Sequence, residues 1–94
     1  MKVIGLKILD DFVNKHSDAR GQIGAWISDV TEATWDNPGQ IIARYAKASF
    51  LSGNRVIFNI KGNRYRLEVK VNYENKIVLV KQIGTHAEYS KWQL

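Results

Sequence analysis

The amino-acid sequence predicts one α+β domain over residues 1–94, with N-terminal helices packed on one face of a small antiparallel sheet. Three observations predict this fold class. Apolar residues recur at helical spacing in the first half, they alternate on both sides of Gly62-Asn63 in the second, and 94 residues are too few for two cores. The content of 45% apolar and 24% charged residues is that of a globular protein.

The chain opens on a short apolar stretch, residues 3–6, that fits an initial strand. Apolar residues then recur at helical spacing at Leu9, Phe12 and Val13, and the positions between them are polar or charged. This pattern is typical of an amphipathic helix with one face in the core, so a first helix is expected here.

A second helix is expected next, with Ser17 and Asp18 providing its cap and first-turn chemistry. Residues 36–39, which contain the only proline, end this helical pattern. A short helical turn is expected beyond them. The apolar face of the second helix is formed by Ile23, Trp26, Ile27 and Val30, and that of the short turn by Ile41, Ile42 and Tyr45.

Residues 55–70 are predicted to form a β-hairpin, because Gly62-Asn63 between two alternating runs is typical of a tight turn. The turn sets the register, and directly opposed residues share a face of the sheet. One face is then wholly apolar or aromatic, with Val56, Phe58, Ile60, Tyr65, Leu67 and Val69. The other receives Arg55, Ile57, Asn59, Lys61, Arg64, Arg66, Glu68 and Lys70.

A third antiparallel strand is predicted at residues 77–83, after a turn at 72–75. This segment is apolar on both sides, which indicates a central position in the sheet.

The net positive charge comes entirely from the second half of the chain. Lys and Arg number 14 and Asp and Glu 9, for a net charge of +5, yet residues 1–47 carry equal numbers of acidic and basic side chains. On the polar face of the hairpin, Lys61 opposes Arg64 and Arg55 opposes Lys70, and opposed like charges destabilise a sheet. An anionic ligand such as a row of phosphates would relieve this repulsion, whereas the alternative is a solvated basic face without a ligand.

Several function classes are excluded by the residues themselves. The chain has no cysteine, only two histidines and no clustered carboxylates, so thiol catalysis, disulfides and a catalytic metal site are not expected. No phosphate-loop or dinucleotide-binding motif is present, and no cofactor is expected. The apolar runs are too short for a membrane span or a signal peptide, so a cytoplasmic protein is expected.

His86 is the candidate for proton transfer, because imidazole titrates near neutral pH. It follows the third strand, where side chains can reach over the rim of the sheet. Tyr89 lies three positions further on, which puts both side chains on one side of a helical turn.

Two motifs, residues 58–67 (FNIKGNRYRL) and residues 83–89 (IGTHAEY), resemble the HigB-type toxins of bacterial toxin–antitoxin systems, members of the RelE/ParE superfamily. The resemblance covers nearly the whole chain, including the helical first half. It implies a RelE-like fold, endoribonuclease activity on mRNA, commonly on the translating ribosome, and neutralisation by a HigA-type antitoxin with a helix-turn-helix domain.

Metal-free RNA cleavage uses the substrate's own 2′-hydroxyl against the adjacent phosphate, so the protein must orient the strand, move protons and stabilise charge. Arg66 is assigned to the scissile phosphate and His86 to proton transfer, while Tyr89 binds a phosphate or stacks on a base. Lys61 is placed beside them on a flanking phosphate. The further RNA-binding residues are expected to be Arg55, Asn59, Arg64 and Lys70.

Two other classes of function stay open on the sequence. One is a binding module without catalysis, in which the same cationic face holds nucleic acid or an acidic protein. The other is a toxin of the same fold that acts on gyrase, as certain superfamily relatives do, and that would not need His86.

Overall fold

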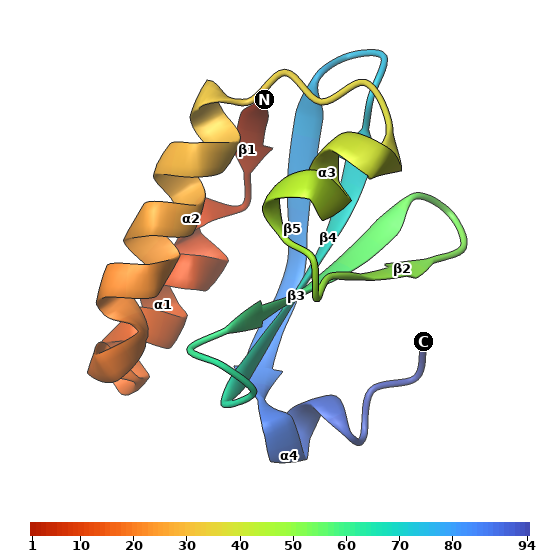
Figure 1. The fold of residues 1–94 in the computed structure, drawn as a ribbon. Helices are drawn as coiled ribbons and strands as arrows, with labels where there is room; N and C mark the ends of the chain where they lie inside the picture. Colours follow the sequence, from red (N-terminus) through yellow and green to blue (C-terminus); the bar gives the residue numbers. More distant parts are fainter.

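One five-stranded sheet organises the structure, a computed structural model that describes residues 1–94. Across the sheet the strands run in the order β1 (Lys2–Ile4), β5 (Ile77–Thr85), β4 (Tyr65–Asn72), β3 (Arg55–Ile60) and β2 (Ser49–Leu51) (Figure 1). β1 is parallel to β5, and the other neighbours are antiparallel.

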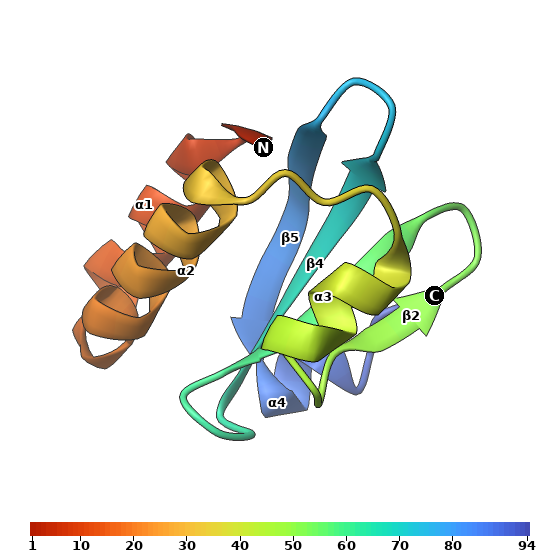
Figure 2. The ribbon, with the colours of Figure 1, turned by 45° about the horizontal axis from the view of Figure 1, so that its top comes forward.

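The helices are α1 (Leu6–Lys15), α2 (Arg20–Glu32), α3 (Pro38–Arg44) and the short α4 (His86–Tyr89), with a 3₁₀ turn at Ser17–Ala19 before α2. Helices α1, α2 and α3 cover one face of the sheet, and in Figure 2 the segment that follows β5 passes behind it. None of the helices has the length and apolar character needed to cross a membrane. The predicted α+β fold class is confirmed.

The register predicted for the β3–β4 hairpin is confirmed along both strands, from Arg55 opposite Lys70 to Ile60 opposite Tyr65. The predicted pair of Lys61 and Arg64 belongs to a four-residue turn instead. The face predicted to be apolar lies under the helices and is buried. Its residues join those of α1, α2 and α3 in one core of 19 buried side chains, in which Trp26 packs edge-on against Phe58 at 5.5 Å between ring centroids.

The central position predicted for the third strand is also confirmed, since β5 lies between β1 and β4. The strand continues past the predicted end to Thr85. Glu68 pairs with Gln82 and Val69 with Val80, so Lys81 is an extra residue that forms a bulge.

The first strand is shorter than predicted, because the chain turns sharply at Gly5 and Leu6 already begins α1. Gly5 has a φ of 97°, and a Cβ there would lie 3.0 Å from Cβ of Val80. Glycine is the residue that tolerates both this backbone conformation and this close approach.

The cap predicted for the second helix is wrong. α2 begins after Ala19 with no side-chain cap, and the carboxylate of Asp18 turns instead towards the β3–β4 turn. The short turn predicted beyond Pro38 is a full helix, because Pro38 occupies the first helical position and the Asn37 side chain accepts a hydrogen bond from Gln40 N. Strand β2 was not predicted, since its three residues are too few to show a period.

The second face of the sheet is less open than its polar pattern indicated. Ile57 is 1% exposed, Glu68 4% and Arg66 9%. The segment after β5 covers part of this face: the Tyr89 ring lies under the Arg66 guanidinium, and a Cβ at Gly84 would lie 3.2 Å from Cζ2 of Trp92. The cations of β3 and β4 are therefore in different environments rather than in one open row.

Candidate functional site

The guanidinium of Arg66 lies on β4, on the face opposite α1, α2 and α3. Its Nη1 donates to the carbonyl oxygen of Asn63 at 2.8 Å, and its Cζ lies 5.1 Å from the centroid of the Tyr89 ring. No carboxylate forms an ion pair with it, and its Nε and Nη2 donate no hydrogen bond within the protein. A nearly buried cation normally has an anionic partner. Arg66 therefore keeps Nε and Nη2 available to an anion.

The start of α4 places His86 near Tyr89, whose ring lies under this guanidinium. The backbone N–H of His86 donates to the carbonyl oxygen of Arg64 at 2.9 Å, and the His86 and Tyr89 rings are 6.2 Å apart between centroids. The His86 side chain is exposed and Tyr89 is half-buried. The imidazole, the phenol and the Arg66 guanidinium are thus brought into one neighbourhood.

A capping box fixes this end of α4. The Thr85 hydroxyl accepts from Glu88 N at 3.2 Å, and the Glu88 carboxylate accepts from Thr85 N at 2.8 Å. The hydrogen bond from the Thr85 backbone holds the pKa of Glu88 below its usual range, so Glu88 stays ionised. The two hydrogen bonds between Thr85 and Glu88 therefore fix the direction that the chain takes at His86, where it leaves β5.

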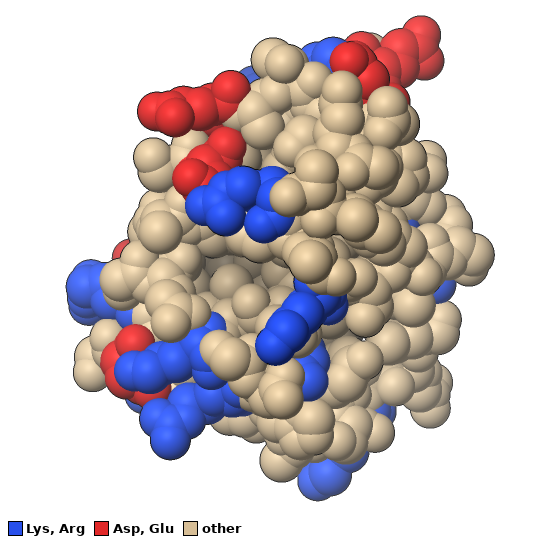
Figure 3. Space-filling model, in the orientation of Figure 1, with Lys and Arg blue, Asp and Glu red and all other residues tan.

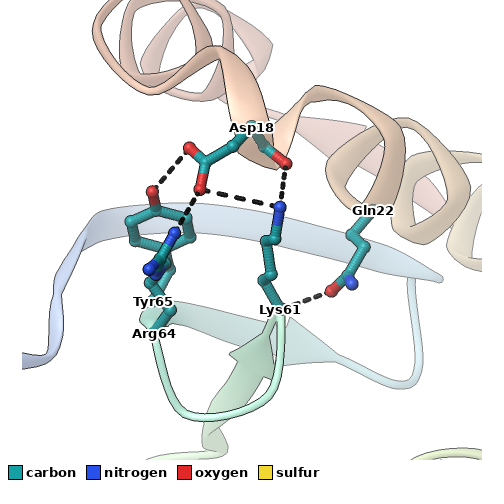
Figure 4. A network of polar contacts seen from close by, with 5 residues as sticks. All are labelled: Asp18, Gln22, Lys61, Arg64 and Tyr65. Carbon is teal, nitrogen blue, oxygen red and sulfur yellow. Dashed lines mark hydrogen bonds and ion pairs between the residues drawn. The ribbon is translucent and has the colours of Figure 1, made fainter.

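Lys61 and Arg64 are not beside Arg66 but at the hairpin turn, where both side chains reach Asp18 (Figure 4). Arg64 Nη1 lies 2.9 Å and Lys61 Nζ 3.7 Å from Oδ2 of Asp18. The strict alternation that predicted a shared face ends with the strands, since Lys61 has a left-handed φ of 53°. These two cations therefore form a separate group.

Arg55 and Lys70 are at the other end of the hairpin. Arg55 is 3.8 Å from the buried carboxylate of Glu68, which also accepts a hydrogen bond from Gln82 at 2.6 Å. Lys70 is exposed and forms no ion pair. It is four positions along β4 from Arg66, or about 13 Å at the rise of a strand.

Asn59 is opposite Arg66 in the register, as predicted, but its amide lies 3.5 Å from the Asn63 side chain and does not bond the guanidinium. Six of the eight predicted site residues thus fall into three groups, and Asn59 and Lys70 belong to none of them. Arg66, His86 and Tyr89 lie together, Lys61 and Arg64 share Asp18, and Arg55 pairs with Glu68.

The sequence reasoning missed Asp18 and the Thr85–Glu88 pair as parts of this region. The spacing of Thr85 and Glu88 is the capping-box pattern and could have been recognised. Asp18 offered no such signal, because its partners lie more than forty positions away along the chain.

A hollow between α2, α3 and the β3–β4 turn opens on the helix-covered side, and basic side chains stand around it in Figure 3. It has a volume of about 170 Å³. The Arg44 guanidinium in its wall is paired with Asp29 at 2.5 Å. Arg66 has no such carboxylate partner, so it is the stronger candidate for binding an anion. No three His, Asp or Glu side chains lie close enough together to share a metal ion.

Comparison with known proteins gives one family. The HigB_toxin family model, described as the RelE-like toxic component of a toxin–antitoxin system, matches residues 19–92. The match spans α2 to α4 and includes the eight site residues predicted from the sequence, while Asp18 lies one position before it. No curated protein matches the chain.

Proposed function

The chain belongs to the HigB family of RelE-like toxins, and from this membership we propose that it is a metal-independent endoribonuclease that cleaves mRNA. A toxin of a toxin–antitoxin system has an antitoxin partner. We propose that this partner is a HigA-type protein with a helix-turn-helix domain, and that the mRNA is cut on the translating ribosome.

The observation that carries this proposal is the state of Arg66. Arg66 as a residue is 9% exposed, and its guanidinium has no carboxylate partner and keeps Nε and Nη2 free of protein acceptors. A phosphodiester supplies the missing charge and matches the planar fork of a guanidinium in two hydrogen bonds. Hydrogen bonds to a non-bridging oxygen strengthen as negative charge develops there, which is how such a group lowers the barrier.

In the proposed reaction the 2′-hydroxyl of the nucleotide attacks its own 3′-phosphate. The new O2′–P bond forms as the P–O5′ bond breaks, which leaves a 2′,3′-cyclic phosphate and a free 5′-hydroxyl. His86 moves a proton, either from the 2′-hydroxyl or to the departing 5′-oxygen. Tyr89, whose ring supports Arg66, binds a phosphate or stacks on a base with its free surface.

The remaining cations give the RNA its path. Lys61 and Arg64 bind a phosphate on the turn side of Arg66, while Arg55 and Lys70 contact the strand further along the hairpin. Asn59, on the neighbouring strand, contacts a base edge. Binding that rests on several phosphate contacts weakens as salt rises.

The test uses purified protein and a short RNA, with induced expression in cells alongside. Arg66→Ala is expected to lower the cleavage rate about 10²–10³-fold, and His86→Ala about 10²–10⁴-fold. His86→Ala should leave RNA binding intact. Lys7→Ala, which removes a cation on α1 whose side chain is 86% exposed, is the charge-matched control and should change neither rate nor affinity.

Two substrate conditions probe the chemistry itself. An RNA with deoxyribose at the cleavage site should not be cut, and EDTA should leave cleavage unchanged. Cleavage of the deoxy substrate, or loss of activity with chelator, would contradict the 2′-hydroxyl mechanism. Growth arrest with intact transcripts would instead favour the gyrase-directed alternative, and full cleavage by His86→Ala would remove the histidine from the mechanism.

A further inference from the structure

The carboxylate of Asp18 is the point at which the β3–β4 turn is attached to the helices (Figure 4). Tyr65 OH donates to Oδ1 at 2.6 Å, Arg64 Nη1 donates to Oδ2 at 2.9 Å, and Lys61 Nζ donates to the backbone carbonyl of Asp18 at 3.2 Å. One helical turn further on, Gln22 Oε1 accepts a hydrogen bond from Lys61 N. All the hydrogen bonds that join the turn to the helical layer end on Asp18 or Gln22.

The same turn supports both groups that we assign to the reaction. The carbonyl oxygen of Asn63 accepts from Arg66 Nη1 at 2.8 Å, and the carbonyl oxygen of Arg64 accepts from His86 N at 2.9 Å. Asp18 itself touches neither Arg66 nor His86. It holds the backbone whose carbonyls orient them.

The turn needs an external attachment because its own structure is weak. Lys61 adopts a left-handed φ of 53°, which costs energy in a residue with a side chain, and the neighbouring Gly62 has a φ of 66°. A single backbone hydrogen bond, from Arg64 N to Lys61 O at 3.2 Å, closes the turn. Exposed turns with so few internal bonds open readily unless they are held by their surroundings.

We propose that Asp18 is a positioning residue for Arg66 and His86, acting through the turn 61–64. This inference rests on the proposed function. Without the carboxylate, the turn loses its attachment through Arg64 and Tyr65, and the two carbonyl oxygens lose their fixed places. A shift of about 1 Å in a group that binds the reacting phosphate is enough to slow a reaction strongly.

A different role predicts the opposite result. If Asp18 only neutralised Lys61 and Arg64, its removal would free two cations and tighten RNA binding without slowing cleavage. If it only stabilised the fold, its removal would lower the unfolding midpoint and leave the rate of the folded protein unchanged. Rate and affinity measured together therefore separate positioning from both roles.

The experiment compares Asp18→Ala, Asp18→Asn and Asp29→Ala under single-turnover conditions with saturating RNA. Asp18→Ala is expected to cleave about tenfold more slowly, with an affinity for RNA that is equal to or tighter than that of the wild type. Asp18→Asn keeps an oxygen acceptor and is expected to recover part of the rate. Asp29→Ala removes a carboxylate that likewise accepts hydrogen bonds from an arginine and a tyrosine, Arg44 and Tyr45 at the end of α3. This variant should cleave at the wild-type rate.

Amide hydrogen exchange provides a second readout that does not depend on cleavage. In Asp18→Ala, exchange at the amides of Arg64 and His86 should accelerate, while that of Val56 and Val69 in the centre of the hairpin should not. Loss of rate without faster exchange at His86, or tighter binding at full rate, would overturn the positioning role. If the wild-type protein does not cleave RNA, the proposed function fails, and unchanged exchange would independently refute the attachment.

Discussion

Helix α2 has a similar polar junction at each of its ends, and the two differ in what they hold. Near its C-terminal end, Asp29 accepts hydrogen bonds from Arg44 at 2.5 Å and from Tyr45 OH at 2.9 Å. Just before its N-terminal end, Asp18 accepts from Arg64 at 2.9 Å and from Tyr65 OH at 2.6 Å. In each case the arginine and the tyrosine are consecutive in the sequence.

The Asp29 junction holds α3, an element with its own cap and internal hydrogen bonds. The Asp18 junction holds a four-residue turn that has one internal backbone hydrogen bond. Two carbonyl oxygens of this turn accept hydrogen bonds from Arg66 and from the backbone of His86. An Asp–Arg–Tyr junction therefore matters more where the element it attaches is less stable on its own. At α3 the three side chains add to a helix that its own hydrogen bonds already stabilise. At the turn they provide most of the hydrogen bonds that hold its conformation.

The largest expected effect comes from removing the side chain that keeps α2 on the sheet. Trp26, 2% exposed and packed against Phe58, lies between the two junctions on α2. Trp26→Ala should lower the free energy of unfolding by about 3–5 kcal/mol, because the cavity left by the indole cannot fully close. Chemical denaturation measures this loss, and both junctions should loosen together in hydrogen exchange. A change confined to one end of α2 would show that the helix does not couple them.

A smaller effect is expected when the Asp29 junction alone is weakened. Burial, reinforced by the Asp29 carboxylate, raises the pKa of Tyr45 to about 12, so its hydroxyl stays a hydrogen-bond donor over the whole working range of pH. Tyr45→Phe removes that donor and should cost about 1 kcal/mol in the free energy of unfolding. Cleavage of RNA by the folded variant should be unchanged. A loss of activity here would erase the distinction between the two junctions.

The smallest effect concerns acid stability, because the Asp18 carboxylate is one-third exposed and solvent screens its charge. The hydrogen bond from Tyr65, followed by that from Arg64, holds the pKa of Asp18 below its usual range. A carboxyl group with a lowered pKa in the folded state contributes stability above its unfolded pKa of about 3.9, and this contribution is lost as the pH falls through the folded value.

The stability of the wild type minus that of Asp18→Asn should therefore be positive and constant above about pH 5 and shrink towards zero on acidification. Urea unfolding at a series of pH values measures it. Asp36→Asn is a useful reference, since Lys76 lowers the pKa of Asp36 in the same way far from the turn. A difference that grew as the pH fell would mean that the Asp18 pKa is raised in the folded protein.

The centre of the hairpin could be predicted from the sequence because two independent patterns had to agree. A turn at Gly62-Asn63 and alternation on both strands are compatible with only one register, and the structure has that register from Arg55 to Ile60. The directions of Lys61 and Arg64 could not be predicted in this way. Alternation applies to extended residues, and at the turn the contacts with Asp18 decide where the side chains go.

The neighbourhood of Arg66, His86 and Tyr89 was anticipated from the position of α4 after β5, since a side chain at a strand end can reach over the rim. What the sequence could not show is that Arg66 would be buried without a carboxylate. That property depends on the Tyr89 ring and on the pairing of Glu68 with Arg55 and Gln82, all of which are tertiary contacts. The edge strand β2 was missed for a simpler reason, because three residues show no period.

The parallel pairing of β1 with β5 has a consequence for synthesis. Lys2 lies beside Ile77, so the sheet gains its first strand only when its last one is available. Contacts between such distant positions form late in folding, after the entropy of closing the intervening loop has been overcome. A nascent chain therefore cannot complete this sheet until translation has passed β5, so the folded sheet appears only after residues 77–85 have been synthesised.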